Sequence, residues 1–117
     1  MNKFSMTTPL EGEYFTTVRL AVGGLCALAG FDVDSAEDFK VCVTESLLIL
    51  KRNGFTTATV TLEVGEALAC QIAGEELGGE RLETPEDEIS HALLSALLGT
   101  VEFEKELDKV VKIKFEG

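Results

Sequence analysis

Hydrophobic residues recur every three to four positions over residues 11–29, which predicts an amphipathic helix. A second helical stretch begins at Ser35, where the hydroxyl and the carboxylate of Asp38 predict a capped helix start. Asn53 and Gly54 follow its last apolar position. We expect them to end this helix, because glycine readily adopts positive φ.

Strict alternation of apolar and polar residues over positions 57–64 predicts a half-buried strand. Gly65 and Glu66 predict a two-residue hairpin turn into a second strand over residues 68–72. Apolar residues show no regular spacing over residues 74–83, and the segment is rich in glycine, so we expect a long loop there. Shorter alternations predict three further strands, at residues 3–8, 101–104 and 111–115.

A third helix is predicted to start at Thr84 and Pro85, because threonine caps helix N-termini and proline suits the first helical position. Gly99 is expected to end it. Its expected buried stripe consists of Ile89, Ala92, Leu93, Ala96 and Leu97.

The order of predicted elements is β-α-α-β-β-α-β-β, within a single domain that spans residues 1–117. Short turns between consecutive strands indicate antiparallel pairs. Each strand has one apolar face and each helix has one apolar stripe. The sequence therefore predicts an α/β (α+β) fold, a two-layer sandwich with helices on one face of a mixed, mostly antiparallel sheet.

The chain has 117 residues and a net charge of −11, from 21 acidic and 10 basic residues. This balance argues against nucleic acid and against an anionic membrane as partners, because both are bound through Lys and Arg. No apolar run has the length of a signal peptide or a membrane span, so a cytoplasmic protein is expected. Cys26, Cys42 and Cys70 form no CxxC pair, so we predict buried, reduced thiols and no metal site.

Several strings in the sequence resemble a known family. They are residues 37–45 (Glu-Asp-Phe-Lys-Val-Cys-Val-Thr-Glu), 18–22 (Val-Arg-Leu-Ala-Val), 29–31 (Ala-Gly-Phe) and 93–102. Together with the element order, they resemble the anti-sigma-factor serine kinases of the GHKL (Bergerat-fold) ATPase superfamily. The resemblance covers nearly the whole chain and implies that family's fold, with a nucleotide cleft.

The first motif of that family is Glu-x-x-x-Asn on one helix, where Glu is the general base and Asn helps to hold Mg²⁺. Glu45 matches the Glu, but Ile49 stands at the Asn position and has no oxygen to offer a hard cation. Glu45 is either a surviving catalytic base or an ordinary helical Glu paired with Lys or Arg. Asn53 either replaces the missing ligand or simply ends the helix.

The second motif, Asp-x-Gly-x-Gly, binds adenine through its Asp and lets the backbone approach the base at its glycines. Its Asp position falls on or near Gly74, and Gly78 stands in the stretch that follows. The nearest carboxylates are Glu75 and Glu76, one and two residues later. The resemblance therefore implies that the adenine site has lost the carboxylate that accepts from the base, or that a carboxylate one or two residues later takes its place.

The third motif is a glycine-rich turn that cradles phosphates before the last helix. Here residues 86–90 read Glu-Asp-Glu-Ile-Ser, so a phosphate there would meet carboxylates, with Ser90 as the nearest hydroxyl. The repulsion between one carboxylate and one unit of phosphate charge at 4 Å is about 4 kcal/mol near a protein surface, before screening by salt. Residues 74–90 carry seven acidic residues against one basic residue. The seven are Glu75, Glu76, Glu80, Glu83, Glu86, Asp87 and Glu88. This segment is a degenerate nucleotide lid, an acidic docking surface or a solvated loop.

The sequence departs from all three family motifs, which favours a family member that neither binds ATP nor acts as a kinase. We therefore expect no cofactor. The resemblance then implies a regulatory module that binds a sigma factor or an anti-anti-sigma protein and that forms a homodimer. One alternative is an active serine protein kinase with an altered site, using Mg·ATP and Glu45 as its base. A second alternative is an interaction protein of the same fold with no connection to sigma factors.

Overall fold

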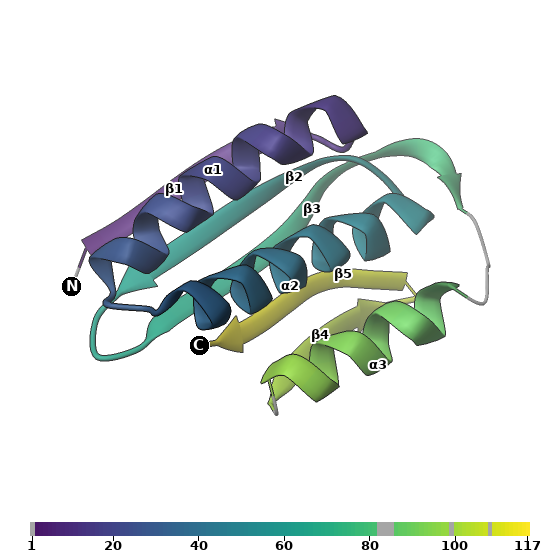
Figure 1. Cartoon of the computed structure of the whole chain (residues 1–117). Coiled ribbons are helices and arrows are strands. Elements are labelled where there is room, and N and C mark those ends of the chain that lie inside the picture. Colours follow the sequence, from purple (N-terminus) through teal and green to yellow (C-terminus); the bar gives the residue numbers. More distant parts are fainter. Residues whose placement is uncertain (1, 82–85, 99, 108) are drawn as a thin grey trace.

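The computed structural model describes residues 2–81, 86–98, 100–107 and 109–117. The elements follow the predicted order along the chain (Figure 1). They are β1 (Asn2–Pro9), α1 (Gly12–Leu28), α2 (Val33–Arg52), β2 (Asn53–Val64), β3 (Leu68–Arg81), α3 (Glu86–Leu98), β4 (Val101–Glu106) and β5 (Lys109–Glu116).

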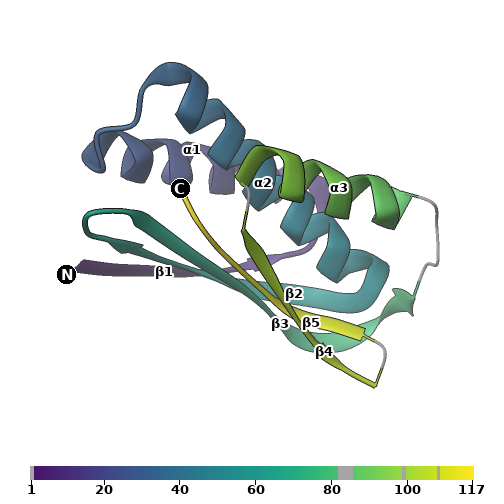
Figure 2. The same ribbon diagram turned by 90° about the horizontal axis from the view of Figure 1, so that it is seen from below.

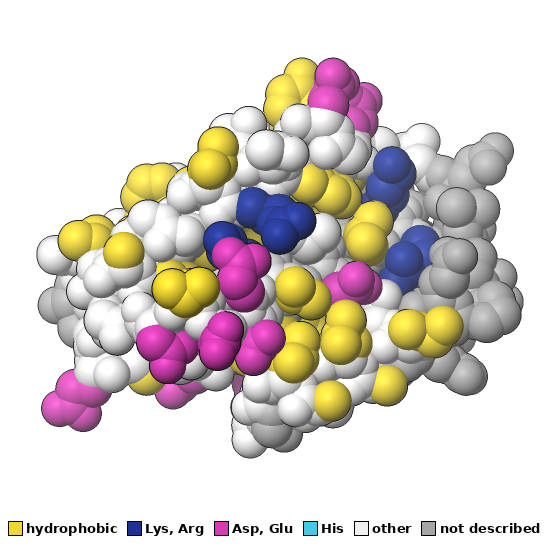
Figure 3. Space-filling view, viewed as in Figure 1, with side chains coloured by type: hydrophobic (Ala, Val, Ile, Leu, Met, Phe, Trp, Pro, Cys, Tyr) yellow, Lys and Arg dark blue, Asp and Glu magenta, His cyan; other side chains and the backbone are white. Residues whose placement is uncertain are grey.

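The five strands form one sheet in the order β1-β2-β3-β5-β4, and the three helices cover one of its faces (Figures 1 and 2). This arrangement confirms the two-layer α+β sandwich. Every neighbouring pair in the sheet is antiparallel, so the expectation of a mixed sheet was wrong. The reason is that α1 and α2 run in opposite directions and return the chain to the end at which β1 finished (Figure 1). Side chains of both charge signs lie among apolar ones on the helical face (Figure 3).

The core lies between α2 and the middle of the sheet. Ala58, Val60 and Leu62 of β2 are fully buried, which confirms the alternation read from the sequence. The helix α2 presents most of its apolar residues to these strands, and those side chains are Phe39, Cys42, Val43, Leu47, Ile49 and Leu50. The central position of α2 explains why Glu45 and Ile49, which the resemblance matches to the first motif, lie next to the core.

Residues 74–81 are part of a strand, so the predicted loop over residues 74–83 was wrong there. β3 continues to Arg81 and stays paired with β2 up to Asn53. The pairing is irregular between Asn53 and Ala58, with shifts in register. Such shifts break the alternation of side chains, while the backbone still pairs regardless of side-chain type. Residues 82–83 lie outside the described part of the chain.

The start of α2 differs from the expected Ser35. The helix begins at Val33, and Asp32 is its N-cap, because the Asp32 carboxylate accepts a hydrogen bond of 2.7 Å from the Ser35 amide. This bond lowers the pKa of the Asp32 carboxyl below its usual value. Ser35 therefore lies in the first turn, and Asp38 does not complete a capping box with it.

The end of α2 is as predicted. Asn53 is the C-cap, and Gly54 takes a φ of +95°. The Asn53 side chain donates to the Ile49 carbonyl at 2.7 Å and accepts from the Val110 amide at 3.1 Å. This single amide group ties the end of α2 to β5.

The connection between β2 and β3 is a loop of three residues rather than the predicted two-residue turn. Val64 pairs with Leu68, so Gly65, Glu66 and Ala67 all lie outside the ladder. The Gly65 amide donates to the Ala67 carbonyl at 3.2 Å, which closes the loop.

The buried face of α3 is centred on Ser90 and Leu94, so the predicted stripe was shifted. Ile89 is 66% exposed, and Ala92 and Ala96 are also exposed. A polar residue takes a core position here, which an apolar pattern does not anticipate. The predicted start at Thr84 and Pro85 and the predicted stop at Gly99 lie outside the described residues.

All three cysteines are buried and unpaired, as predicted. Burial raises the pKa of the Cys42 thiol to about 12, and it also raises the pKa values of Cys26 and Cys70. Within the described ranges, no group of residues has the arrangement of a metal site, and no helix is long and apolar enough to cross a membrane.

Candidate functional site

Two of the residues matched to family motifs meet between α2 and α3. The Ser90 hydroxyl donates a hydrogen bond to Glu45 Oε2 at 2.7 Å. Ser90 is 3% exposed and Glu45 is half-buried. The two residues are 45 positions apart in the sequence, so only the packing of α3 on α2 brings them together.

Arg52 completes this group from the last turn of α2. Its guanidinium donates to Ser90 Oγ at 2.6 Å, so the Ser90 hydroxyl accepts from Arg52 and donates to Glu45 at the same time. Charged partners on both sides strengthen hydrogen bonds of this kind. We call Arg52, Ser90 and Glu45 the polar tie, because it joins α2 to α3.

Ile49, where the resemblance expects an Asn, lies in the core. Its side chain is fully buried and belongs to the main hydrophobic cluster. A helical spacing of four places Ile49 beside Glu45 along α2. The space next to Glu45 where a metal-binding amide would stand in the family is therefore occupied by packed hydrocarbon.

Gly74, near which the resemblance places the Asp of the adenine motif, lies against the ring of Phe55. A Cβ atom at Gly74 would come within 2.5 Å of the ring carbons Cγ and Cδ1. Phe55 is 6% exposed and part of the core cluster. An Asp at this position would displace the ring, so Phe55 takes the space that a side chain at position 74 would need.

Gly78 lies on the exposed part of β3, where a Cβ atom would only touch the Thr56 methyl group at 3.7 Å. It therefore belongs to a paired strand and not to a turn around a ligand. No pattern in the sequence predicts this, because glycine is uncommon within strands.

The acidic segment spans two elements. Glu75 and Glu76 are exposed on β3, and Glu80 lies near the end of the same strand. Glu86, Asp87 and Glu88 form the first turn of α3. Glu83 lies outside the described residues. The interpretation as a single solvated loop is therefore wrong for the residues that lie in β3 and α3.

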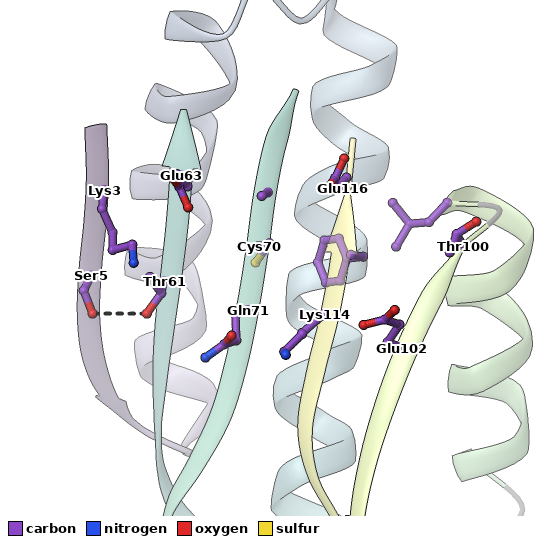
Figure 4. Close-up of a pocket in the computed structure, with 13 residues that line it drawn as sticks. Lys3, Ser5, Thr61, Glu63, Cys70, Gln71, Thr100, Glu102, Lys114 and Glu116 are labelled. Atoms are coloured by element: carbon purple, nitrogen blue, oxygen red, sulfur yellow. Dashed lines mark hydrogen bonds between the residues drawn. The ribbon is translucent and has the colours of Figure 1, made fainter. Parts of the chain in front are cut away.

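A shallow depression of about 840 Å³ lies on the sheet (Figure 4). Its lining mixes polar and apolar residues, with Ser5 and Thr61 side by side at 3.4 Å between their oxygens. Charges of both signs line it, from Lys3, Glu63, Glu102, Lys114 and Glu116. Sequence reasoning missed this depression, because alternating polar residues on a strand are typical of a solvated face.

This depression offers no activated nucleophile among its described residues. Cys70 contributes to the lining but is 3% exposed, and burial raises its pKa, so its thiol stays protonated at neutral pH. Lys114 is held by Glu104 at 3.3 Å. The arrangement suits non-covalent contact rather than covalent chemistry.

The sequence matches no known family and no curated protein. The polar tie and the ring of Phe55 against Gly74 are therefore the features on which a function can be argued. The one sequence signal for the tie is a serine at a position of α3 between apolar neighbours, since a buried hydroxyl needs a polar partner.

Proposed function

We propose that this chain is a cytoplasmic regulatory module that binds another protein, resembles the anti-sigma factors of the GHKL superfamily, and works without ATP. The observation that carries the proposal is the hydrogen bond from Ser90 to Glu45. Glu45 is the residue that still matches the first family motif, and this bond gives its carboxylate a partner inside the protein.

A general base must accept a proton from its substrate, so its oxygen has to be accessible to that substrate. Oε2 of Glu45 already accepts from Ser90, whose hydroxyl is itself held by Arg52. Ile49 supplies no oxygen for Mg²⁺. The residues at the first motif therefore support the packing of two helices in place of phosphoryl transfer.

The surroundings of Gly74 support the same proposal. Adenine recognition in the family needs an Asp at this position, and here the ring of Phe55 lies within 2.5 Å of where its Cβ would be. Moving a ring that is 6% exposed would cost core packing. A nucleotide would thus have to compete with the protein's own hydrophobic core.

The charge of the chain suits a basic protein partner. The net charge is −11, and Glu75 and Glu76 are exposed on β3. Complementary charge increases the association rate and the specificity of protein complexes. A sigma factor exposes a basic DNA-contacting surface. Among the partners that the resemblance implies, it therefore fits the acidic charge of this chain best.

The test is calorimetric titration of the purified chain with the sigma factors and anti-anti-sigma proteins of its own organism, with and without Mg·ATP. We expect one of them to bind, with an affinity that falls as salt rises and that Mg·ATP leaves unchanged. The double variant Glu75→Lys/Glu76→Lys should bind more weakly. The control Glu11→Lys/Glu13→Lys reverses two charges at the start of α1 and should bind like the wild type.

The outcomes separate the alternatives. Binding that requires Mg·ATP would favour the active serine kinase. Absence of binding to every sigma factor and anti-anti-sigma protein would contradict the connection to sigma factors and favour an unrelated interaction protein. Equal losses in both charge-reversal variants would show that Glu75 and Glu76 are not the contact surface.

A further inference from the structure

Asn53 is followed by Gly54, and this pair of residues has a chemistry of its own. The backbone nitrogen of the residue after an asparagine can attack the carbonyl carbon of the asparagine side chain. Glycine hinders this attack least, because it has no side chain and its backbone adopts many conformations. The other asparagine of the chain, Asn2, precedes Lys3, whose side chain hinders the same attack. Asn53 is therefore the residue at which the unfolded chain should deamidate first.

Deamidation needs no reactant besides water. The Gly54 nitrogen forms a bond to Asn53 Cγ, the bond from Cγ to Nδ2 breaks, and Nδ2 leaves as ammonia with the proton of the Gly54 amide. Water then opens the resulting five-membered imide at one of its two carbonyl carbons. Opening at Cγ leaves an aspartate at this position. Opening at the backbone carbonyl leaves an isoaspartate, in which the main chain runs through Cβ and Cγ.

The folded chain holds the Asn53 side chain in a position that opposes this attack. Nδ2 donates to the Ile49 carbonyl at 2.7 Å, and Oδ1 accepts from the Val110 amide at 3.1 Å. Both hydrogen bonds must break before Cγ can turn toward the Gly54 nitrogen. Asn53 is also 7% exposed, so breaking them would leave buried polar groups without partners.

The backbone at Asn53 is unsuited to ring closure as well. Its ψ of 5° makes the Gly54 nitrogen nearly eclipse the Asn53 nitrogen, whereas the five-membered ring requires it to eclipse Cβ. Because α2 ends at Arg52 and β2 begins at Asn53, the rotation would separate the helix from the strand. The facing strand leaves little room for it, since the Gly54 oxygen is 3.3 Å from where a Cβ on Gly79 would lie.

We propose that the Asn53–Gly54 pair is a latent deamidation site, protected while α2, β2 and β5 stay packed and reactive once their junction opens. The two hydrogen bonds of the Asn53 amide are what joins these elements, with Ile49 on α2 and Val110 on β5. Loss of the junction and exposure of the reactive pair are therefore the same event. The inference does not depend on the proposed function.

Either product of the reaction should weaken the folded state. An aspartate has no hydrogen to donate at neutral pH, so a carboxylate oxygen would replace the donor that now lies 2.7 Å from the Ile49 oxygen. An isoaspartate also adds one atom to the main chain between α2 and β2, which displaces the strand relative to the helix. A chain that has reacted once should therefore open more readily than before, which makes the change one-way.

Peptide mass spectrometry of the full chain, held in mildly alkaline buffer with and without guanidinium, tests the inference. In guanidinium we expect Asn53 to convert faster than Asn2. Without guanidinium, conversion of Asn53 should be slower by about tenfold or more, because folded domains are unfolded for only about a thousandth of the time or less. A smaller difference between the two conditions, or Asn2 reacting first in guanidinium, would overturn the proposal.

Refolding gives a second readout, which tests the consequence of the reaction. Wild type is held in guanidinium for increasing times and refolded by dilution, and its denaturation midpoint is then measured. We expect a less stable population to grow in step with conversion of Asn53. The control is Asn53→Gln, which forms no five-membered ring, so its midpoint should not change with holding time, whatever its initial value. An unchanged wild type after conversion, or an equal decline in Asn53→Gln, would overturn the proposal.

Discussion

Ser90 on α3 donates its hydroxyl hydrogen to the Glu45 carboxylate on α2, across 2.7 Å. The two residues occupy positions that the family resemblance assigns to nucleotide chemistry. Here they hold two helices together, with Arg52 as the third member of the tie. This contact joins α3 to α2, and it also supports the proposal that Glu45 no longer takes part in ATP chemistry.

Replacing Ser90 by alanine should destabilise the protein, because Glu45 and Arg52 would each lose their bond to the hydroxyl. Loss of a partner at a buried polar group costs about 1–3 kcal/mol. Urea denaturation of Ser90→Ala measures this loss. Ser95→Ala removes an exposed hydroxyl from the same helix and should stay within about 0.5 kcal/mol of the wild type. Equal effects in the two variants would contradict a role for the polar tie in stability.

Replacing Gly74 by alanine should also destabilise the protein, because its Cβ would meet the Phe55 ring at 2.5 Å. Overpacking of this kind typically costs about 1–3 kcal/mol. The cost should shrink when Phe55→Ala removes the ring, so a double-mutant cycle isolates the contact. Gly12→Ala, which has nothing within 4 Å, is the control. A cost at Gly74 that is the same with and without the Phe55 ring would contradict this packing.

The fold was largely predictable, whereas the residues in contact at the site were not. Alternation over residues 57–64 revealed β2, because each core side chain there is apolar and each opposite one is polar. The continuation of β3 beyond Gly74 left no such pattern, because its pairing with β2 is irregular. The contact of Ser90 with Glu45 depends on how α3 lies on α2, which no local pattern records.

Replacing Asn53 should show how much one side-chain amide contributes at the end of α2. Asn53→Ala leaves the Ile49 carbonyl and the Val110 amide without this partner, and each lost bond of this kind costs about 1–3 kcal/mol. Asn53→Asp keeps the acceptor for Val110 and loses the donor to Ile49. We expect its unfolding free energy to fall between those of Asn53→Ala and the wild type. A stability of Asn53→Ala equal to that of the wild type would contradict this account.

The stability of the protein should decline as pH rises above about 9, because burial raises the pKa of Cys42 from 9.0 to about 12. The unfolded chain loses this proton at lower pH than the folded chain, so the contribution is complete below 9.0 and is lost toward 12. Denaturant titrations at increasing pH measure the decline. Cys42→Ala should show a shallower decline, and an identical slope in the two proteins would rule out this thiol as a cause.

The buried thiols should also resist modification. Cys26, Cys42 and Cys70 have raised pKa values and little exposure, so the reactive thiolate is scarce in the folded protein. A colorimetric thiol reagent should react slowly with the native chain and at once with all three cysteines in guanidinium. Rapid reaction of the folded protein would show that at least one thiol is accessible.

Mg·ATP titration, followed by thermal denaturation of the wild type, tests most directly the claim that ATP plays no part. A ligand present at 100 times its dissociation constant would add about 2.7 kcal/mol to the stability of the folded state. We expect neither Mg·ATP nor Mg·ADP to raise the melting temperature. A rise with Mg·ATP that disappears in Glu45→Ala would contradict the account and identify Glu45 as part of a working nucleotide site.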